Sequence, residues 1–345
     1  MHVCRRVRLN QNSLVCFGFI LAVVKYAFAS TAFRLPEWCD VVLMLAALSC
    51  FTLHIVRTQI KGKAFLIFLI SLAVAVTVYL NNGHDDDLII LVVAVYALRD
   101  IDINKLIKSY SGVMLLFFVA VMCYSLFTGE HLGNYMEYRI ERGYEYRYTF
   151  GFVHPNSLHG MYLRIACALL LTQWGRKHRR MKYIFLEVGN YLLFLFSDSR
   201  TGFIILTMVL LISFVTEYII TEFRRRRYLD IIRIFNIGII AFTIFASINL
   251  KNFKVLVWLD SLCTGRFDMA NRFLQKFPIT FWGTDITYID KSRYAAPQVL
   301  DCGIISTLLH YGVLVFGISI IIYMVGLKKI WRQYDNVAMA IVTGF

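Results

Sequence analysis

Long apolar runs alternate with short polar segments along almost the whole chain. A run of about 20 apolar residues is long enough to cross the hydrocarbon core of a bilayer as a helix. The pattern predicts spans at 13–33, 38–56, 64–80, 88–98, 110–128, 155–174, 183–197, 202–220, 231–249 and 301–326. The predicted fold class is all-α, a polytopic transmembrane helical bundle of about 10–11 spans, because a backbone in lipid must satisfy its own hydrogen bonds.

Three of the apolar runs differ from a full span. The runs at 88–98 and 183–197 are short, and a last run from Val337 stops at Phe345, after too few residues to cross. The first run ends in "AFAS", Ala27 to Ser30, which imitates a secretory signal. Because 13–33 is longer than a signal core, we predict an uncleaved span, with cleavage as the alternative.

The composition agrees with a membrane protein. The chain has 345 residues, of which 59% are hydrophobic and 17% charged. A soluble domain has about 45–50% apolar and about 25% charged residues. The net charge of +14 could suit nucleic acid, but the basic residues form short clusters between apolar runs, which is a topology signal. We therefore predict no nucleic-acid partner.

The basic clusters also orient the chain, because Lys and Arg concentrate in inner loops. With the N-terminus inside, the inner segments carry 22 of the 36 Lys and Arg residues and the outer segments 12. The outer side then holds 129–154, the turn 197–200 and 250–300. We predict a single integral membrane domain, 1–345, with 129–154 and 250–300 as its first and second large extracytoplasmic loops.

In the first outer loop, arginine and histidine residues precede the start of a predicted helix. Its tyrosine-rich composition fits an amphipathic interfacial segment, but Arg139, Arg142 and Arg147 are also candidate anion binders, because guanidinium groups bind phosphate bidentately. His154 precedes Pro155, a residue that suits the first position of a helix, where the dipole favours an anion. His154 either caps this helix or serves as a proton acceptor or hydrogen-bond donor.

Further polar candidates follow in later spans and turns. Arg164 lies ten residues beyond His154, about 15 Å along a helix, which puts a cation deep in the span. Arg200 begins a predicted helix on the same side, Arg266 follows a glycine, and Asp301 opens the last span. Cys263 and Cys302 both fall on the outer side, and a disulfide between them is left open.

Three consecutive carboxylates, Asp85 to Asp87, follow His84 and invite interpretation as a metal site. Carboxylates at a helix start are also ordinary caps and complements of the helix dipole. Because consecutive residues do not share one helix face, we predict capping, and we expect neither a metal site nor a cofactor.

The motifs occur in a distinctive order. In chain order they read "FGFVHPNS", "SDSRTG", "TGR" and "DCG", the last followed by "YG". This order, within residues 110–326, resembles the O-antigen polymerase and ligase superfamily, above all its capsule and exopolysaccharide repeat-unit polymerases. The resemblance implies a multi-pass protein of the bacterial cytoplasmic membrane. Its activity would be that of a metal-independent glycosyltransferase-type polymerase, acting on the outer face on undecaprenyl-pyrophosphate-linked oligosaccharides.

The resemblance also implies partners and residue roles. The partners would be the lipid-linked oligosaccharide and, in the same membrane, a chain-length regulator and a flippase. The catalytic group would comprise His154 as base or acceptor orienter and Arg147, Arg200 and Arg266 as pyrophosphate contacts. The substrate-binding group would comprise Arg142, Asn156, Arg164 and Asp301. Two alternatives stay open: a ligase that transfers glycan to a lipid or protein acceptor, and a lipid-linked glycan flippase, although no internal repeat typical of transporters is present.

Overall fold

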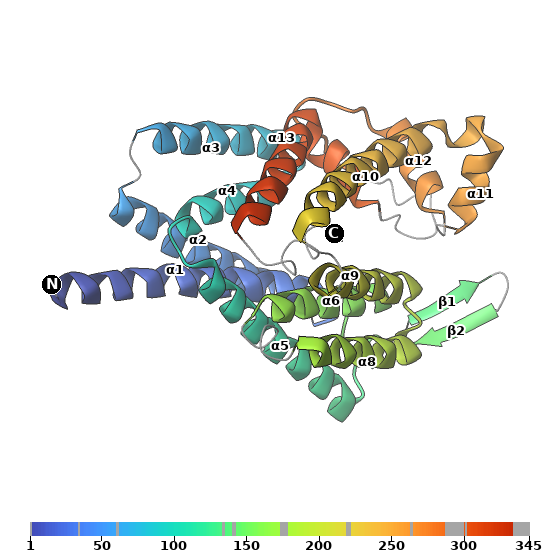
Figure 1. Cartoon of the computed structure of the whole chain (residues 1–345), viewed down its shortest axis with the longest axis horizontal. Helices are drawn as coiled ribbons and strands as arrows, with labels where there is room; N and C mark the ends of the chain where they lie inside the picture. Colours follow the sequence, from blue (N-terminus) through green and yellow to red (C-terminus); the bar gives the residue numbers. More distant parts are fainter. Residues whose placement is uncertain are drawn as a thin grey trace. The chain divides into compact units, whose positions relative to one another are not determined.

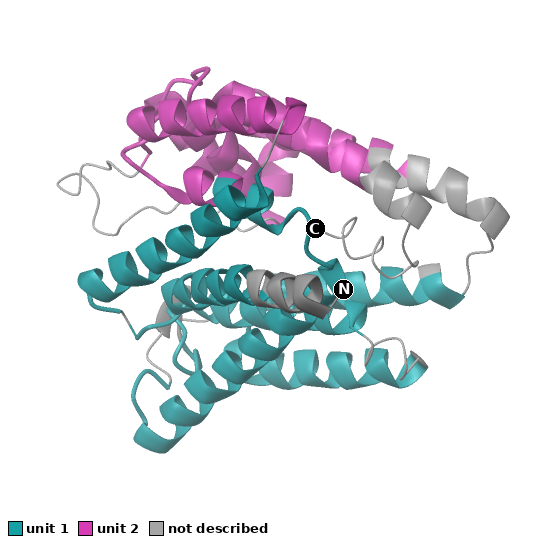
Figure 2. Ribbon diagram, turned by 90° about the vertical axis from the view of Figure 1, so that its left-hand side faces the viewer, with its two compact units in different colours: residues 1–60, 93–220, 334–345 teal, residues 61–92, 221–333 magenta. Residues whose placement is uncertain are grey.

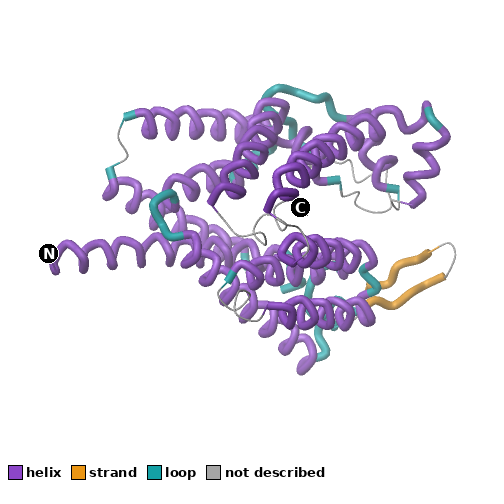
Figure 3. The backbone as a smooth tube through the Cα atoms, in the orientation of Figure 1, coloured by secondary structure: helices purple, strands orange, loops and turns teal. Residues whose placement is uncertain are grey.

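The computed structural model is built of helices with one β-hairpin (Figures 1 and 3). It describes residues 2–33, 35–59, 62–132, 135–139, 143–172, 179–218, 222–262, 265–286, 300 and 302–333. The helices in these ranges are α1 (His2–Ala29), α2 (Glu37–Thr58), α3 (Lys63–Asn81), α4 (Asp87–Leu98), α5 (Ile103–Thr128), α6 (Pro155–Leu171), α8 (Arg179–Ser197), α9 (Arg200–Tyr218), α10 (Glu222–Asn249), η1 (Leu250–Asn252), α11 (Lys254–Leu262), α12 (Arg266–Lys276) and α13 (Gly303–Gln333).

The prediction of an all-α membrane bundle is confirmed by the length and apolar character of these helices. Over the described residues, five segments are long and apolar enough to cross a bilayer: Glu37–Thr58, Lys63–Asn81, Ile103–Thr128, Ile234–Asn252 and Gly303–Gly326. Three shorter apolar helices cover Ser13–Ala29, Asp87–Leu98 and Arg200–Val215.

These helices do not test the predicted number of 10–11 spans, which stays a prediction. The runs predicted at 155–174 and 183–197 form α6 and α8, which belong to neither the long nor the shorter apolar group. Both helices carry polar side chains within their apolar sequence, such as Arg164 in α6 and Glu187 in α8. A charged side chain inside a span faces protein or a polar cavity rather than lipid.

The chain divides into two compact units, which Figure 2 colours separately. The first comprises residues 1–60, 93–220 and 334–345, and the second residues 61–92 and 221–333. The single integral membrane domain stays a prediction.

The first unit is a helical bundle in which α6 is central. Helix α1 packs on α2 and α5, α5 packs on α6, and α6 packs on both α8 and α9. Its core includes Phe118, Leu158, Met161 and Ile165, all of them buried. Lys25, a cation within the first predicted span, pairs with Asp40 of α2 at 3.6 Å, which removes the cost of an isolated charge there.

The outer loop predicted at 129–154 contains an antiparallel hairpin of β1 (Tyr135–Arg139) and β2 (Gly143–Arg147). The register pairs Tyr135 with Arg147. Beyond the hairpin, the backbone N–H of Ala32 donates to the carbonyl of Gly151 at 2.9 Å, and Thr31 forms a β-bridge with Phe152. These bonds attach the segment to the end of α1 and so fix the point at which α6 begins.

The second unit contains the other predicted outer loop, 250–300, much of which is helical. Its described part forms η1, α11 and α12, and α10 packs on α12 and α13. Helix α13 is kinked at Gly312, where φ is 79°. The N–H of Val313 donates to Thr280 at 3.0 Å, and the N–H of Thr284 donates to Leu309 at 2.9 Å, so segment 280–284 satisfies the backbone groups that the kink releases.

Candidate functional site

The turn between α8 and α9 is the centre of the polar site in the first unit. Ser197 and Ser199 are fully buried, whereas Asp198 lies between them with its side chain about one-third exposed. Asp198 has a φ of 43°, a left-handed conformation that Asn and Asp tolerate better than most residues. The turn therefore presents the Asp198 side chain outward while its neighbours anchor it.

Arg147, the last residue of β2, lies beneath this turn and is 4% exposed. Its Nε donates to the Ser197 carbonyl at 2.8 Å, and its Nη2 donates to the Asp198 carbonyl at 2.9 Å. A cation suits the C-terminal end of a helix, where carbonyls are left without intrahelical partners. In this position Arg147 supports the turn, and its predicted contact with a pyrophosphate stays a prediction.

Arg200, the first residue of α9, occupies the open side of the same turn. Its side chain is 50% exposed, and its Nε lies 3.5 Å from Oδ1 of Asp198. An exposed pair at this separation is weak. The guanidinium can therefore turn toward an anionic ligand at little cost.

His154 caps the start of α6, as one of its two predicted roles requires. Its Nδ1 accepts a hydrogen bond from the Asn156 N–H at 3.0 Å. In a neutral imidazole whose Nδ1 accepts, Nε2 carries the hydrogen and is a donor. This arrangement favours His154 as a hydrogen-bond donor over His154 as a proton acceptor.

Asn156 joins the start of α6 to the turn. Its Oδ1 accepts a hydrogen bond from the Ser199 hydroxyl at 2.8 Å. Two helix N-termini, those of α6 and α9, therefore lie side by side at this point, and each carries the positive end of a helix dipole. Arg147, His154, Asn156 and Arg200 are thus brought together around the turn.

His159 also belongs to this site, although the sequence assigned it no role. It is fully buried, and its Nδ1 is hydrogen-bonded to the Ser197 hydroxyl at 3.1 Å. A Cβ at Gly202 would collide with the His159 side chain, so α9 approaches α6 this closely because Gly202 has none. The signal in the sequence was the second histidine of "HPNSLHG", together with the glycine of "SDSRTG".

Two other predicted site residues, Arg164 and Arg266, belong to α6 and α12. Arg164 donates from Nε to the carbonyl of Gly160 in its own helix at 3.2 Å. Arg266 begins α12 in the second unit, after Gly265 with a φ of 78°. Arg142 and Asp301 lie outside the described residues, as does Cys263, so these two site residues and the Cys263–Cys302 disulfide remain open.

The carboxylates at 85–87 confirm one part of the capping prediction and correct another. Oδ1 of Asp85 accepts from the N–H of Asp87, the first residue of α4, at 2.9 Å. Contrary to expectation, one carboxylate oxygen from each of the three lies within 4.8 Å of the others, because only Asp87 belongs to the helix. Nε2 of His310 lies 2.8 Å from Oδ2 of Asp85, which ties this turn to α13.

The fold defines an all-α membrane protein, and its first unit presents a polar turn that bears arginine. No protein-family model, no curated protein and no solved structure matches the chain. The resemblance to the O-antigen polymerase superfamily therefore stays a prediction from the order of the sequence motifs.

Proposed function

We propose that this protein polymerises undecaprenyl-pyrophosphate-linked oligosaccharide repeat units into a surface polysaccharide at the outer face of the bacterial cytoplasmic membrane. The observation that supports the proposal most is the turn 197–200. There, two helix N-termini meet through the Asn156–Ser199 hydrogen bond, beside the half-exposed Arg200. Such a place suits a diphosphate, because backbone dipoles and a guanidinium both favour negative charge.

The reaction would be a glycosyl transfer driven by loss of the diphosphate. A hydroxyl oxygen of the acceptor glycan forms a bond with the anomeric carbon of the donor glycan. The bond from that carbon to the pyrophosphate oxygen breaks, and its electron pair leaves with undecaprenyl pyrophosphate. Charge grows on the leaving group during this step, and fixed positive groups stabilise it most in the transition state.

The residues of the turn divide these tasks. Arg200 contacts the departing pyrophosphate, and buried Arg147 holds the turn in shape through Ser197 and Asp198. The Asp198 carboxylate beside Arg200 takes the proton of the attacking hydroxyl. His154 orients the acceptor through its Nε2–H, because its Nδ1 already accepts from Asn156.

Reconstitution tests this proposal. The purified protein is placed in liposomes with undecaprenyl-pyrophosphate-linked repeat units, and product length is measured by gel electrophoresis. We expect chains of many repeats from the wild type and a loss of at least about 100-fold in rate for Arg200→Gln, since one stabilising donor is worth about that much. Arg272→Gln is the matched control, because Arg272 is a similarly exposed arginine that pairs with a nearby aspartate, Asp268.

The same assay separates the alternatives. A ligase would leave repeat-unit length unchanged and would transfer glycan once a lipid or protein acceptor is added. A flippase would move the donor across the liposome membrane without lengthening it. Either result, or equal rates for Arg200→Gln and Arg272→Gln, would contradict polymerisation by the turn.

A further inference from the structure

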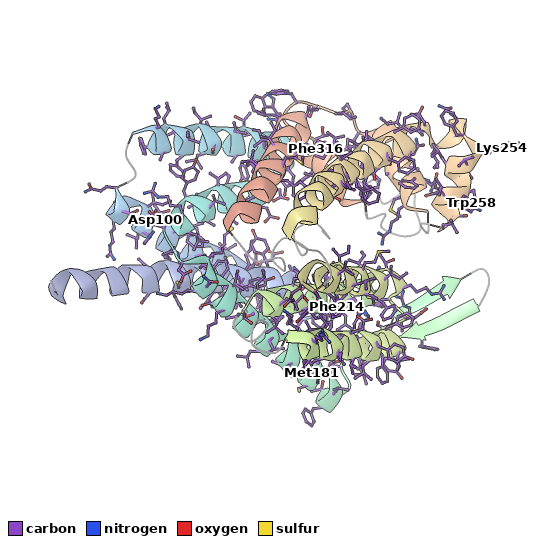
Figure 4. The ribbon with its side chains drawn as sticks, in the orientation of Figure 1. Asp100, Met181, Phe214, Lys254, Trp258 and Phe316 are labelled. Atoms are coloured by element: carbon purple, nitrogen blue, oxygen red, sulfur yellow. The ribbon has the colours of Figure 1, made fainter. Side chains whose placement is uncertain are left out.

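A long groove runs between α8 and α9 in the first unit. Its volume is about 740 Å³, within the range of about 300–1,000 Å³ that small-molecule sites occupy. Both walls are mostly apolar, with Ile184, Val188 and Leu192 on α8 and Leu211 and Phe214 on α9. Figure 4 labels Met181 on α8 and Phe214, one of the lining residues, on α9.

Three of the polar residues along the groove, Glu187, Thr207 and Tyr183, are hydrogen-bonded within the protein. Glu187 lines it, but Oε1 of Glu187 accepts from the Thr207 hydroxyl at 2.7 Å and Oε2 accepts from Asn190 at 3.3 Å. Tyr183 also lines it, and its hydroxyl donates to Glu217 at 2.6 Å. The walls therefore offer a ligand mostly hydrocarbon contact along their length.

One end of the groove carries positive charge. Lys182 is fully buried and its Nζ lies 2.8 Å from Oε2 of Glu217, so these two charges neutralise each other. Arg180 lines the groove nearby, is exposed, and stacks over the Tyr218 ring at 5.4 Å. Among the described residues Arg180 has no carboxylate partner, so its charge is available to a ligand.

We propose that this groove binds an anionic phospholipid, with its phosphate at Arg180 and one acyl chain between α8 and α9. Guanidinium binds phosphate oxygens in pairs, and a basic residue at the membrane surface attracts anionic headgroups. From Arg180 to Leu192 α8 rises about 18 Å, close to one leaflet of a hydrocarbon core about 30 Å thick. The groove is therefore long enough to hold the acyl chain of a lipid in that leaflet.

The site is independent of the turn 197–200. Arg180 and Asp198 lie 18 residues apart on α8 and its following turn, about 27 Å along the helix. The phosphate at Arg180 would therefore lie at the end of α8 opposite the proposed reaction site. Loss of lipid binding would leave the proposed polymerisation chemistry in place.

Native mass spectrometry of the full chain in detergent tests this proposal, with phosphatidylglycerol and phosphatidylcholine of identical acyl chains as probes. We expect the wild type to retain phosphatidylglycerol about five-fold better, the preference that one basic residue at a membrane surface confers. Arg180→Gln should remove this preference. The control is Arg99→Gln, another exposed arginine, which pairs with Asp100.

A second pair of variants tests the groove itself. Val188→Trp fills it and should lower retention of both lipids, whereas Phe185→Trp, on the same helix outside the groove, should not. Only variants whose unfolding midpoint equals that of the wild type are compared. Equal retention of the two lipids by the wild type, or binding unchanged by Val188→Trp, would overturn the proposal. So would displacement of phosphatidylglycerol by undecaprenyl phosphate, which would assign the groove to the lipid carrier.

Discussion

At the scale of the residue, Asp198 carries the sharpest expectation. Asp198→Asn keeps a residue that tolerates the left-handed φ of 43°, so the turn should fold as before. The carboxylate that takes the proton is lost, and we expect the rate to fall about 10²–10⁴-fold.

The control for Asp198→Asn is Asp268→Asn, which removes a partly exposed carboxylate that also pairs with an arginine. It should keep the wild-type rate. Polymerisation rates of the two variants, measured side by side, decide the matter. If Asp198→Asn kept the wild-type rate, another group would be the proton acceptor.

His154 calls for a different substitution. His154→Asn keeps an oxygen that can cap α6, because Asn is among the preferred N-cap residues. The unfolding midpoint should therefore change little. The Nε2–H donor is lost, so we expect a fall of about 10-fold in rate. A fall of about 10²–10⁴-fold, the size expected for a lost proton acceptor, would make His154 the base, contrary to our interpretation of its Nδ1 bond.

At the scale of the element, Gly202 decides how closely α9 approaches α6. Gly202→Ala would bring a Cβ into the His159 side chain, and overpacking of this kind costs about 1–3 kcal/mol. We expect a lower unfolding midpoint in detergent and a weaker proposed activity, because the His159–Ser197 hydrogen bond must shift. Gly160→Ala in α6 is the matched control, since its Cβ would meet nothing within 4 Å. If Gly202→Ala were as stable as Gly160→Ala, the space between α6 and α9 would accommodate an added methyl group.

The elements also show which parts of the fold could be predicted from the sequence. Apolar length predicted the long helices well, since burial of a continuous run in lipid depends on composition alone. Apolar length does not predict the hairpin at 135–147, because its tyrosine-rich strands lie in a polar segment for which a loop is expected. The kink at Gly312 was equally hidden, because it depends on backbone contacts with residues 280–284, about thirty positions earlier. The same holds for the site. Arg200 could be predicted from the sequence, as a charged residue at the start of a helix. The hydrogen bond between buried His159 and Ser197 could not, because it forms only in the folded chain.

At the scale of the whole molecule, the remaining question is which side of the membrane each polar segment faces. The distribution of Lys and Arg predicts that 129–154 and 250–300 are outside and 99–109 is inside. The proposed reaction depends on this, since the turn 197–200 must lie on the side where lipid-linked glycans accumulate. The helices on either side of the turn determine its shape but not the side of the membrane on which it lies, so orientation must be measured.

Cysteine labelling measures it. His131→Cys and Lys276→Cys place thiols at exposed positions of the two outer segments, and Asp100→Cys does so in an inner segment (Figure 4). In a parent protein whose own cysteines are replaced and whose insertion is intact, a membrane-impermeant maleimide should label the first two variants in whole cells. It should label Asp100→Cys only after permeabilisation. The reverse pattern would put the turn on the inner side, where a guanidinium could not meet an exported donor, and polymerisation at this site would be ruled out even if Arg200 proved essential.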